Sequence, residues 1–237
     1  TLGRNTVCFF DPAMQATVSH NAAVGADLRK GLQAKQFVVH YQPQVDRYGR
    51  VRSVEALVRW KHPRRGLVMP GEFIPVAEDT GLILPLGRWV LETACAQLAL
   101  WENEGYTQEL SISVNVSVRQ FRHPDFVDMV MEAIQHARIR PHKLKLELTE
   151  SLLADRMEIT LEKMGLLKAL GVTLSLDDFG VGYSSLSVLK RLPLDQLKID
   201  KGFVADVLTD PNDAAISRAI IALAQSLSLQ VVAEGVE

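Results

Sequence analysis

Residues 144–178 read LKLELTESLLADRMEITLEKMGLLKALGVTLSLDD, and this stretch decides the fold class. Apolar runs over 143–148 and 172–176 predict two strands, and the spacing over 159–170 predicts a helix between them. The two strands lie about 30 residues apart, which is the usual length of one strand–helix–strand unit. The stretch therefore predicts parallel strands joined by a right-handed helical crossover.

Strands and helices alternate in the same way on both sides of this stretch. Further strands are expected over 110–116, 196–199 and 230–233, and further helices over 86–103, 126–137, 184–191 and 214–227. This alternation predicts an α/β fold with a mostly parallel sheet. We count seven strands from Phe37 onward, whereas a closed barrel of this kind has about eight. We therefore expect a TIM-like (β/α)8 barrel whose final strand and helix are missing from this chain.

The N-terminal part of the chain is less regular. Residues 1–22 are expected to form a strand and a linker, and residues 23–36 have the spacing of a helix. A turn sequence at 46–49 separates a strand over 37–41 from the strand over 51–57. Parallel pairing would need a crossover of about a dozen residues, so these two strands are expected to pair antiparallel.

Length and charge narrow the function classes. A chain of 237 residues with 47% hydrophobic and 23% charged residues fits one barrel-sized globular domain, which we place at 23–237. A net charge of −2 gives no reason to expect a nucleic-acid polymer or an anionic membrane as partner. Cys8 and Cys95 lie far apart and are expected to be reduced thiols in a cytoplasmic protein.

Six predicted strands end at a residue suited to binding a divalent cation or a phosphate. These residues are Glu55, Asn115, Glu147, Asp177 with Asp178, Lys198 and Glu234. The carboxyl ends of successive barrel strands converge, so these side chains should meet at one end of the barrel. Each alone has a structural explanation, such as an ion pair between Glu55 and an arginine. Together they carry too much inward charge for a purely structural barrel, and they predict a metal site.

The segment 177–185, DDFGVGYSS, follows a predicted strand and precedes a predicted helix. Two adjacent acids repel each other unless a cation neutralises them. The two glycines of the segment 177–185 allow unusual backbone angles, and three hydroxyl side chains follow in the same segment. A surface turn is the alternative, but the position between strand and helix favours a loop that clamps a metal-bound phosphate.

The ligand type predicts the chemistry. Oxygen donors select hard cations, so Mg²⁺ or Mn²⁺ is expected rather than Zn²⁺. The acids suffice for two ions about 4 Å apart, an arrangement that hydrolyses phosphodiesters. Lys198 is placed to orient the attacking water or to stabilise negative charge on the phosphate. The six histidines form no motif, so a histidine base is not expected.

Six ordered motifs closely resemble those of the EAL-domain cyclic-di-GMP phosphodiesterases. They are Glu55-Ala56-Leu57, Asn115-Val116-Ser117, Glu147-Leu148-Thr149-Glu150-Ser151, the 177–185 loop, Lys198-Ile199-Asp200 and Glu234-Gly235-Val236-Glu237. The first 20 residues, especially Gly3-Arg4-Asn5 and Phe10-Asp11-Pro12-Ala13-Met14, resemble the tail of a GGDEF (diguanylate cyclase) domain. Residues 1–22 are therefore expected to be this tail and a linker, and the parent is expected to be a tandem GGDEF–EAL protein. The resemblance implies a barrel with one antiparallel strand, cleavage of cyclic-di-GMP to linear pGpG, and a homodimer.

The resemblance also implies roles for individual residues. The first metal ion would be held by Glu55, Asn115, Glu147 and Asp177, and the second by Asp177, Asp178 and Glu234. Lys198 would hold the attacking water, so we count it as catalytic together with Glu55 and Glu234. Glu150 would brace the loop at 178–185. Arg59 would pair with a phosphate of the dinucleotide, and Gln42 and Leu57 would line its site.

Other functions remain open at this point. A catalytically silent cyclic-di-GMP receptor would share the fold, but silent members lose metal ligands and here every matched position is filled. An enolase-like or aldolase-like metal barrel does not account for Asp177-Asp178 with the two-glycine loop.

Val181 departs from the threonine that the family often has, which removes a hydroxyl from the loop. No membrane contact is expected of this domain, although the parent protein could be anchored elsewhere.

Overall fold

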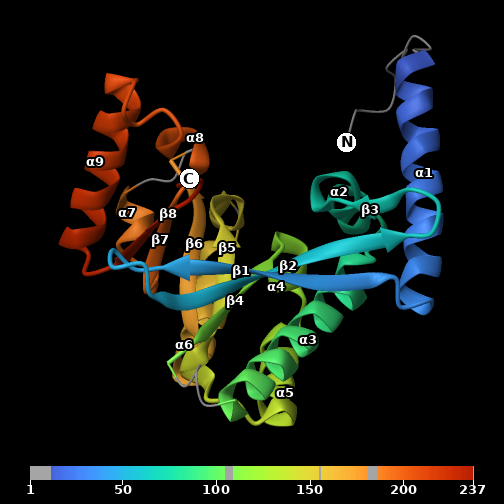
Figure 1. The fold of residues 1–237 in the computed structure, drawn as a ribbon, viewed down its shortest axis with the longest axis horizontal. Helices are drawn as coiled ribbons and strands as arrows, with labels where there is room; N and C mark the ends of the chain where they lie inside the picture. Colours follow the sequence, from blue (N-terminus) through green and yellow to red (C-terminus); the bar gives the residue numbers. More distant parts are fainter. Residues whose placement is uncertain (1–11, 105–108, 155, 181–185, 237) are drawn as a thin grey trace. The chain divides into compact units, whose positions relative to one another are not determined.

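The computed structural model describes residues 12–104, 109–154, 156–180 and 186–236 (Figure 1). The chain forms two compact units, Thr1–Val38 with Arg59–Ile83 and Val39–Val58 with Leu84–Glu237. Strands β1 (Phe37–Val45) and β2 (Val51–His62) run from one unit into the other. Residues 1–11, where the N-terminal strand is predicted, and Val181 lie outside the described residues.

The first unit is built on an aromatic core. Its helices are α1 (Pro12–Gln33) and α2 (Pro70–Thr80), and the short strand β3 (Gly66–Val68) pairs antiparallel with the end of β2. The Trp60 ring lies 5.5 Å from Phe37 and 5.9 Å from Phe73, measured between ring centroids. The Trp60 indole donates a hydrogen bond of 3.1 Å to Gln36 Oε1, which satisfies its buried N–H.

The second unit contains the regular alternation of strands and helices. Its strands are β4 (Ser111–Val116), β5 (Leu144–Thr149), β6 (Thr173–Phe179), β7 (Gln196–Ile199) and β8 (Gln230–Ala233). Its helices are α3 (Ile83–Asn103), α4 (Val118–Arg122), α5 (Phe126–Ala137), α6 (Met157–Ala169), α7 (Leu186–Leu189), α8 (Lys201–Val204) and α9 (Pro211–Ser226), with 3-10 turns η1 (Pro141–Lys143) and η2 (Glu150–Ala154).

The sheet has the strand order β1-β2-β4-β5-β6-β7-β8, and every pair from β2 to β8 along this order is parallel. The strands curl so that one face is turned inward and the other is covered by helices (Figure 1). The predicted α/β fold with a mostly parallel sheet is therefore confirmed. β1 and β2 run in opposite directions around the turn at Asp46–Arg50, which confirms the predicted antiparallel strand.

Alternation along each strand separates the two faces of this sheet. In β5, for example, Leu144, Leu146 and Leu148 are fully buried toward the helices, whereas Glu147 lies on the other face. Helix α6 packs on β6, and α9 packs on β7 and β8. Cys95 is a free thiol buried in α3. The helices thus hold the strands in register, and the inward face is left to polar side chains.

Several elements in the described part of the chain differ from the sequence prediction, among them the short helices α4 and α8, which were not predicted. Helix α1 begins at Pro12, whereas the predicted helix began at residue 23, so residues 12–22 are helical. Helix α2 was not predicted because Pro70 and Pro75 argue against a helix, yet Pro70 occupies the first turn, where a missing N–H costs nothing. β3 adds an eighth strand to the seven that were counted.

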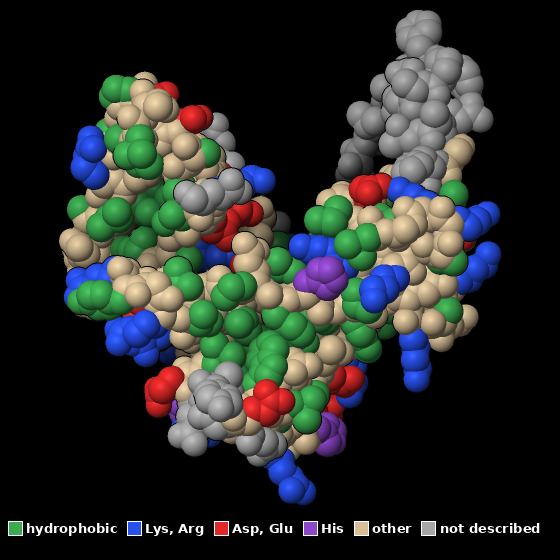
Figure 2. Space-filling model, in the orientation of Figure 1, with side chains coloured by type: hydrophobic (Ala, Val, Ile, Leu, Met, Phe, Trp, Pro, Cys, Tyr) green, Lys and Arg blue, Asp and Glu red, His purple; other side chains and the backbone are tan. Residues whose placement is uncertain are grey.

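The surface shows no single dominant charge on the face drawn in Figure 2, where basic and acidic side chains are interspersed. Among the described residues, none of the helices combines the length and the apolar composition that crossing a bilayer requires.

Candidate metal centre

The structure brings the predicted strand-end residues together on the inward face of the second unit. Parallel pairing places Asn115 of β4 directly opposite Glu147 of β5. Glu55 comes from β2, Asp177 from β6 and Lys198 from β7, and Glu234 directly follows β8. Residues more than 100 positions apart in the sequence thus meet, because Asn115, Glu147, Asp177, Lys198 and Glu234 lie at or near the carboxyl ends of neighbouring parallel strands. Glu55 instead lies within β2, which continues to His62 rather than ending at the predicted residue 57.

Lys198 lies at the centre of the cluster and is almost completely buried, with 1% of its surface exposed. Its Nζ atom lies 2.6 Å from Glu234 Oε1, 2.7 Å from Glu147 Oε2, 3.2 Å from Asp177 Oδ1 and 3.5 Å from Glu55 Oε2. Burial alone lowers the pKa of Lys198, but the surrounding carboxylates outweigh burial and raise it. The lysine is therefore held in its charged form.

Asn115 fixes the orientation of Glu55. Its Nδ2 atom donates a hydrogen bond of 2.7 Å to Glu55 Oε1. This use of the amide nitrogen leaves the amide oxygen of Asn115 as an acceptor, which is the atom that a hard cation would bind.

Glu147 is the most deeply buried acid of the cluster. Burial raises its pKa to about 7, Lys198 opposes that rise, and Glu55 and Asp177 add to it. One of its oxygens is held by Lys198, whereas Oε1 is buried and has no hydrogen-bond partner in the described part of the chain. A buried carboxylate oxygen without a partner is costly, so this atom fits a ligand for a cation.

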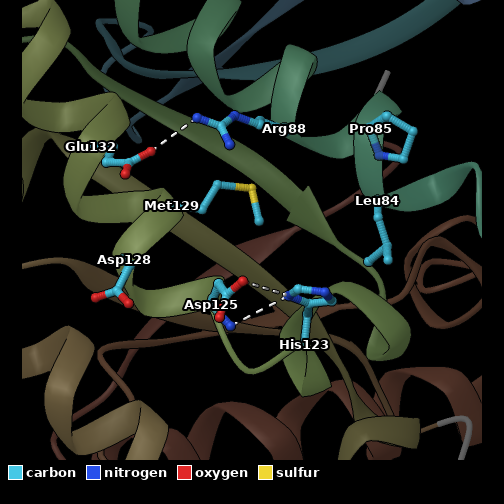
Figure 3. Close-up of a pocket in the computed structure, with 8 residues that line it drawn as sticks. All are labelled: Leu84, Pro85, Arg88, His123, Asp125, Asp128, Met129 and Glu132. Carbon is cyan, nitrogen blue, oxygen red and sulfur yellow. Dashed lines mark hydrogen bonds and ion pairs between the residues drawn. The ribbon is translucent and has the colours of Figure 1, made fainter.

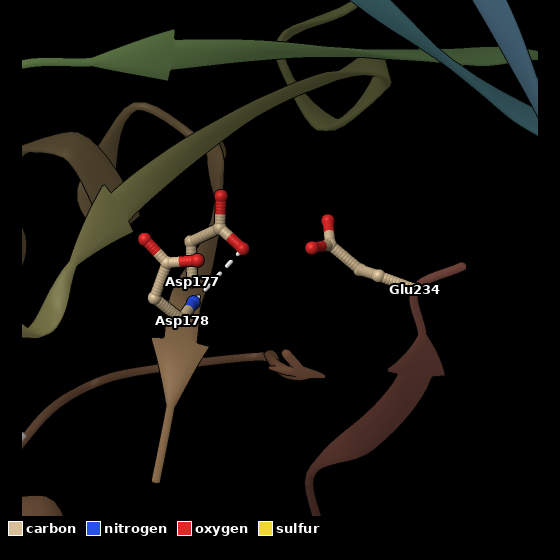
Figure 4. Close-up of side chains that lie close together, drawn as sticks. All are labelled: Asp177, Asp178 and Glu234. Carbon is tan, nitrogen blue, oxygen red and sulfur yellow. Dashed lines mark hydrogen bonds between the residues drawn. The ribbon is translucent and has the colours of Figure 1, made fainter. Parts of the chain in front are cut away.

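Asp177, Asp178 and Glu234 form a second group, with one oxygen of each within 4.8 Å of the others (Figure 4). Adjacent side chains normally point to opposite faces of a strand. Here the pairing of β6 with β7 shifts register between Leu176 and Phe179, and Asp178 has a positive φ of 54°. The irregular backbone lets both aspartates face the cluster, and Asp178 N donates a 3.0 Å hydrogen bond to Asp177 Oδ1.

The second group also has the electrostatics of a cation site. Burial, then the charges of Asp177 and Asp200, raises the pKa of Asp178. Burial also raises the pKa of Glu234, against the effect of Lys198. Burial and mutual repulsion destabilise these three carboxylates in their charged form, and a divalent cation bound between them would relieve that repulsion. Three carboxylates can supply the main ligands of one such ion. The donor set therefore fits a hard metal ion.

The remaining predicted residues lie outside this cluster. Gln42 is exposed on β1. Leu57 is half-buried on β2, two residues after Glu55 and therefore on the same face of that strand. Arg59 lies farther along β2 and belongs to the first unit. Glu150 is buried at the start of η2, and the loop that it is expected to brace includes residues 181–185, which are not described.

Sequence reasoning missed the capping of helix α4, which begins three residues after Asn115. Ser117 caps α4 in a capping box: its Oγ accepts from Gln120 N, and Gln120 Oε1 accepts from Ser117 N, both at 3.2 Å. Gly87 of α3 packs so closely on Gln120 that a Cβ atom there would lie 1.7 Å from Gln120 Nε2. The Ser-x-x-Gln spacing after Asn115 is the signal that would have revealed this cap.

A separate cavity of about 380 Å³ lies between α3 and α5 in the same unit (Figure 3). It is lined by Leu84, Pro85, Arg88, His123, Asp125, Asp128, Met129 and Glu132. Arg88 donates hydrogen bonds to Glu92 and to Glu132 at 2.8 and 2.9 Å. Arg88 and Glu132 are half-exposed and paired with each other, and Asp125 and Asp128 are exposed, so this cavity lacks the buried charged groups that the carboxylate cluster has.

Residues 26–237 match the family described as the EAL domain. The chain belongs to the EAL domain family. It is 47% identical over 236 residues to the bifunctional diguanylate cyclase/cyclic di-GMP phosphodiesterase MucR of Pseudomonas aeruginosa, covering 99% of this chain and 34% of MucR. It is 43% identical over 235 residues to the cyclic di-GMP phosphodiesterase PdeR of Escherichia coli, covering 99% of this chain and 35% of PdeR. This EAL domain chain therefore spans about a third of the length of these curated relatives.

Among solved structures, the chain resembles the PaMucR phosphodiesterase in complex with c-di-GMP, with a TM-score of 0.87 and 48% sequence identity. The match covers 91% of this chain and 87% of that one. The EAL enzyme Bd1971 in its cAMP- and cyclic-di-GMP-bound form matches with a TM-score of 0.88 and 33% identity, over 93% of this chain and 61% of that one.

Proposed function

We propose that this EAL domain hydrolyses one phosphodiester bond of cyclic-di-GMP and releases linear pGpG. The observation that carries the proposal is the convergence of five carboxylates and one asparagine around the buried Lys198. The likeness to MucR and PdeR, which are named for cyclic di-GMP phosphodiesterase activity, supports the substrate.

Divalent cations, Mg²⁺ or Mn²⁺, would polarise the phosphate oxygens and make a water molecule nucleophilic at neutral pH. Glu55, Asn115, Glu147 and Asp177 would hold one ion. Asp177, Asp178 and Glu234 would hold the other, so that Asp177 contributes to both. The unpartnered Glu147 Oε1 atom and the close group of three acids support this division.

Lys198 would act on the attacking water. A charged ammonium donates hydrogen bonds only, so it orients the water oxygen toward phosphorus and stabilises negative charge as it develops. Glu55 and Glu234 would share this role by keeping Lys198 and the ions in position. Arg59 would bind a phosphate of the dinucleotide, Gln42 and Leu57 would line its site, and Glu150 would brace the loop at 178–185.

The parent protein would carry a GGDEF-like domain upstream, with residues 1–22 as its tail and the EAL barrel starting at residue 23. Its partners would be cyclic-di-GMP and a second copy of the chain, and its place would be the cytoplasm. The name of MucR, which includes diguanylate cyclase activity, supports an upstream domain of this type. Light scattering of the purified chain tests the dimer: a monomer at all concentrations contradicts it.

Hydrolysis of cyclic-di-GMP with Mg²⁺ or Mn²⁺, followed by chromatography of pGpG, tests the activity. Asp177→Asn should abolish turnover, because it removes the ligand shared by both ions, whereas the exposed Asp206→Asn should leave turnover unchanged. Binding of cyclic-di-GMP without turnover would favour the silent receptor instead. That alternative is not favoured, because each metal-ligand position holds an oxygen donor.

A further inference from the structure

Each of five strands carries a second polar residue two positions before its metal-centre residue. We name this set the polar floor: Ser53, Ser113, Lys145, Ser175 and Gln196. All five are buried, with exposed fractions between 0% and 7%. The inner layers of parallel barrels are usually filled by bulky branched apolar side chains. A buried layer of three serines, a glutamine and a lysine therefore calls for an explanation.

Strand register places the floor directly beneath the metal centre. Lys145 is the Cα partner of Ser113, and Gln196 is the Cα partner of Ser175. Residues two positions apart in a strand point to the same face and lie about 7 Å from each other. Lys145 thus belongs to the same face of β5 as Glu147, one layer below it.

Hydrogen bonding satisfies the floor only in part. Ser175 Oγ donates to Gln196 Oε1 at 3.3 Å, and Ser53 Oγ donates to Ser111 O at 3.2 Å. Ser113 Oγ is buried without a partner, counting the residues that the structure describes. Over the same residues, Lys145 makes no hydrogen bond or ion pair, although only 7% of its surface is exposed.

A buried ammonium without a paired anion is unfavourable unless nearby negative charge compensates it. The layer above Lys145 supplies that charge, with five carboxyl groups around one lysine. Lys145 therefore lies one layer from this charge, on the same face of β5 as Glu147, and makes no hydrogen bond or ion pair to it among the described residues.

We propose that Lys145 is a buried counter-charge that sets the ion preference of the centre, weakening its hold on cations and strengthening its hold on the anionic nucleotide. The sign follows from Coulomb's law, because a fixed positive charge repels Mn²⁺ and attracts phosphate. The nucleotide half of this inference rests on the proposed function, whereas the cation half does not.

Titration calorimetry of Lys145→Met tests both halves. With Mn²⁺ as probe, the dissociation constant should fall by at least about tenfold, because a unit charge about 7 Å from a divalent ion changes its affinity by nearly that factor even at the dielectric constant of water. With pGpG as probe, at saturating Mn²⁺, the dissociation constant should rise by a similar factor. A residue that only fills space could not shift the two affinities in opposite directions.

Three further variants separate charge from packing. Lys145→Arg keeps the charge and should bind Mn²⁺ as the unmodified chain does. Ser113→Ala changes the same layer without changing its charge, and Arg218→Met removes a charge from the exposed side of α9, on the helix-covered face of the sheet. Ser113→Ala and Arg218→Met should each leave the affinities for Mn²⁺ and for pGpG unchanged.

The inference is overturned if folded Lys145→Met binds Mn²⁺ with unchanged affinity, or if it binds both Mn²⁺ and pGpG more weakly. It is also overturned if Ser113→Ala shows the same changes in the two dissociation constants as Lys145→Met. If the unmodified chain binds neither pGpG nor cyclic-di-GMP, the proposed function fails on its own. The Mn²⁺ titration still decides the role of Lys145 in that case.

Discussion

Glu147 is the residue through which the metal centre responds to pH. Burial raises its pKa to about 7, so a proton and a cation compete for the same carboxylate near neutrality. The raised pKa values of Asp178 and Glu234 act in the same direction. Protonation therefore opposes cation binding over a range in which an exposed glutamate would already be ionised.

We predict that the Mn²⁺ affinity of the metal-free protein rises with pH up to about 7 and changes less above it. Below that value each proton bound at Glu147 must leave before a cation enters, so affinity falls by up to about tenfold per pH unit. Calorimetry across this range measures the effect. Glu147→Gln should bind Mn²⁺ more weakly and lose much of the pH dependence, and an unchanged pH profile in that variant would contradict the assignment.

Lys198 neutralises part of the charge that gathers around it. Lys198→Met should lower the free energy of unfolding of the metal-free protein by about 3 kcal/mol, because carboxylates are left buried without their cation. Saturating Mn²⁺ should recover most of this loss by neutralising the same groups. Urea denaturation with EDTA and with Mn²⁺ measures both values. An equal loss in the two conditions would show that Lys198 stabilises through packing alone.

At the scale of elements, α3 packs on α4 where Gly87 meets Gln120, and α4 directly follows β4, the strand that carries Asn115. A Cβ atom at position 87 would collide with Gln120, whose side chain completes the capping box of α4. Glycine is otherwise a poor helix residue, so its presence inside α3 is explained by this close approach.

Gly87→Ala should therefore lower the free energy of unfolding by about 1–3 kcal/mol through overpacking. Gly165→Ala in α6 is the matched control, because nothing lies within 4 Å of its Cβ position. That change should stabilise the protein by up to about 1 kcal/mol through helix propensity. Chemical denaturation of both variants, and of Gly87→Ala with Gln120→Ala, measures the coupling. If Gly87→Ala costs as much without Gln120, the clash is not the cause.

The elements also show how far the sequence predicts the structure. Strongly periodic segments were placed well: α5, β7 and β8 have the predicted bounds, because their apolar spacing is unambiguous. The rule that functional residues lie near the carboxyl ends of barrel strands correctly placed Asn115, Glu147 and Lys198 together, whereas Glu55 joins them from within the longer strand β2. Helix α4 was missed because five residues are too few for a period to appear.

Features that depend on packing were not predictable in the same way. The register shift in β6 turns Asp178 toward the cluster, and local sequence does not reveal a bulge. The polar floor was missed because each of its members looks ordinary within its own strand. Only the register between strands shows that Lys145 lies one layer below Glu147, where it makes no hydrogen bond or ion pair with the residues that the structure describes.

At the scale of the whole molecule, the chain divides into two units with separate cores, and the carboxylate cluster belongs entirely to the second. The first unit depends on Trp60, which is fully buried against Phe37 and Phe73. β2 contributes Glu55 to the second unit and Trp60 to the first, so one strand serves both cores. The two cores should therefore differ in what their loss does to stability and to cation binding.

Trp60→Ala should lower the free energy of unfolding by about 3–5 kcal/mol, because it leaves a cavity in the aromatic core and orphans Gln36. Its folded fraction should still bind Mn²⁺ with unchanged affinity, because Glu55, Glu147 and Asp177 keep their positions in the second unit. Urea denaturation and calorimetry of the same sample measure the two quantities. Tyr48→Ala, at an exposed position in the β1–β2 turn, should change neither. A marked loss of Mn²⁺ affinity in folded Trp60→Ala would mean that the first core helps to shape the metal centre.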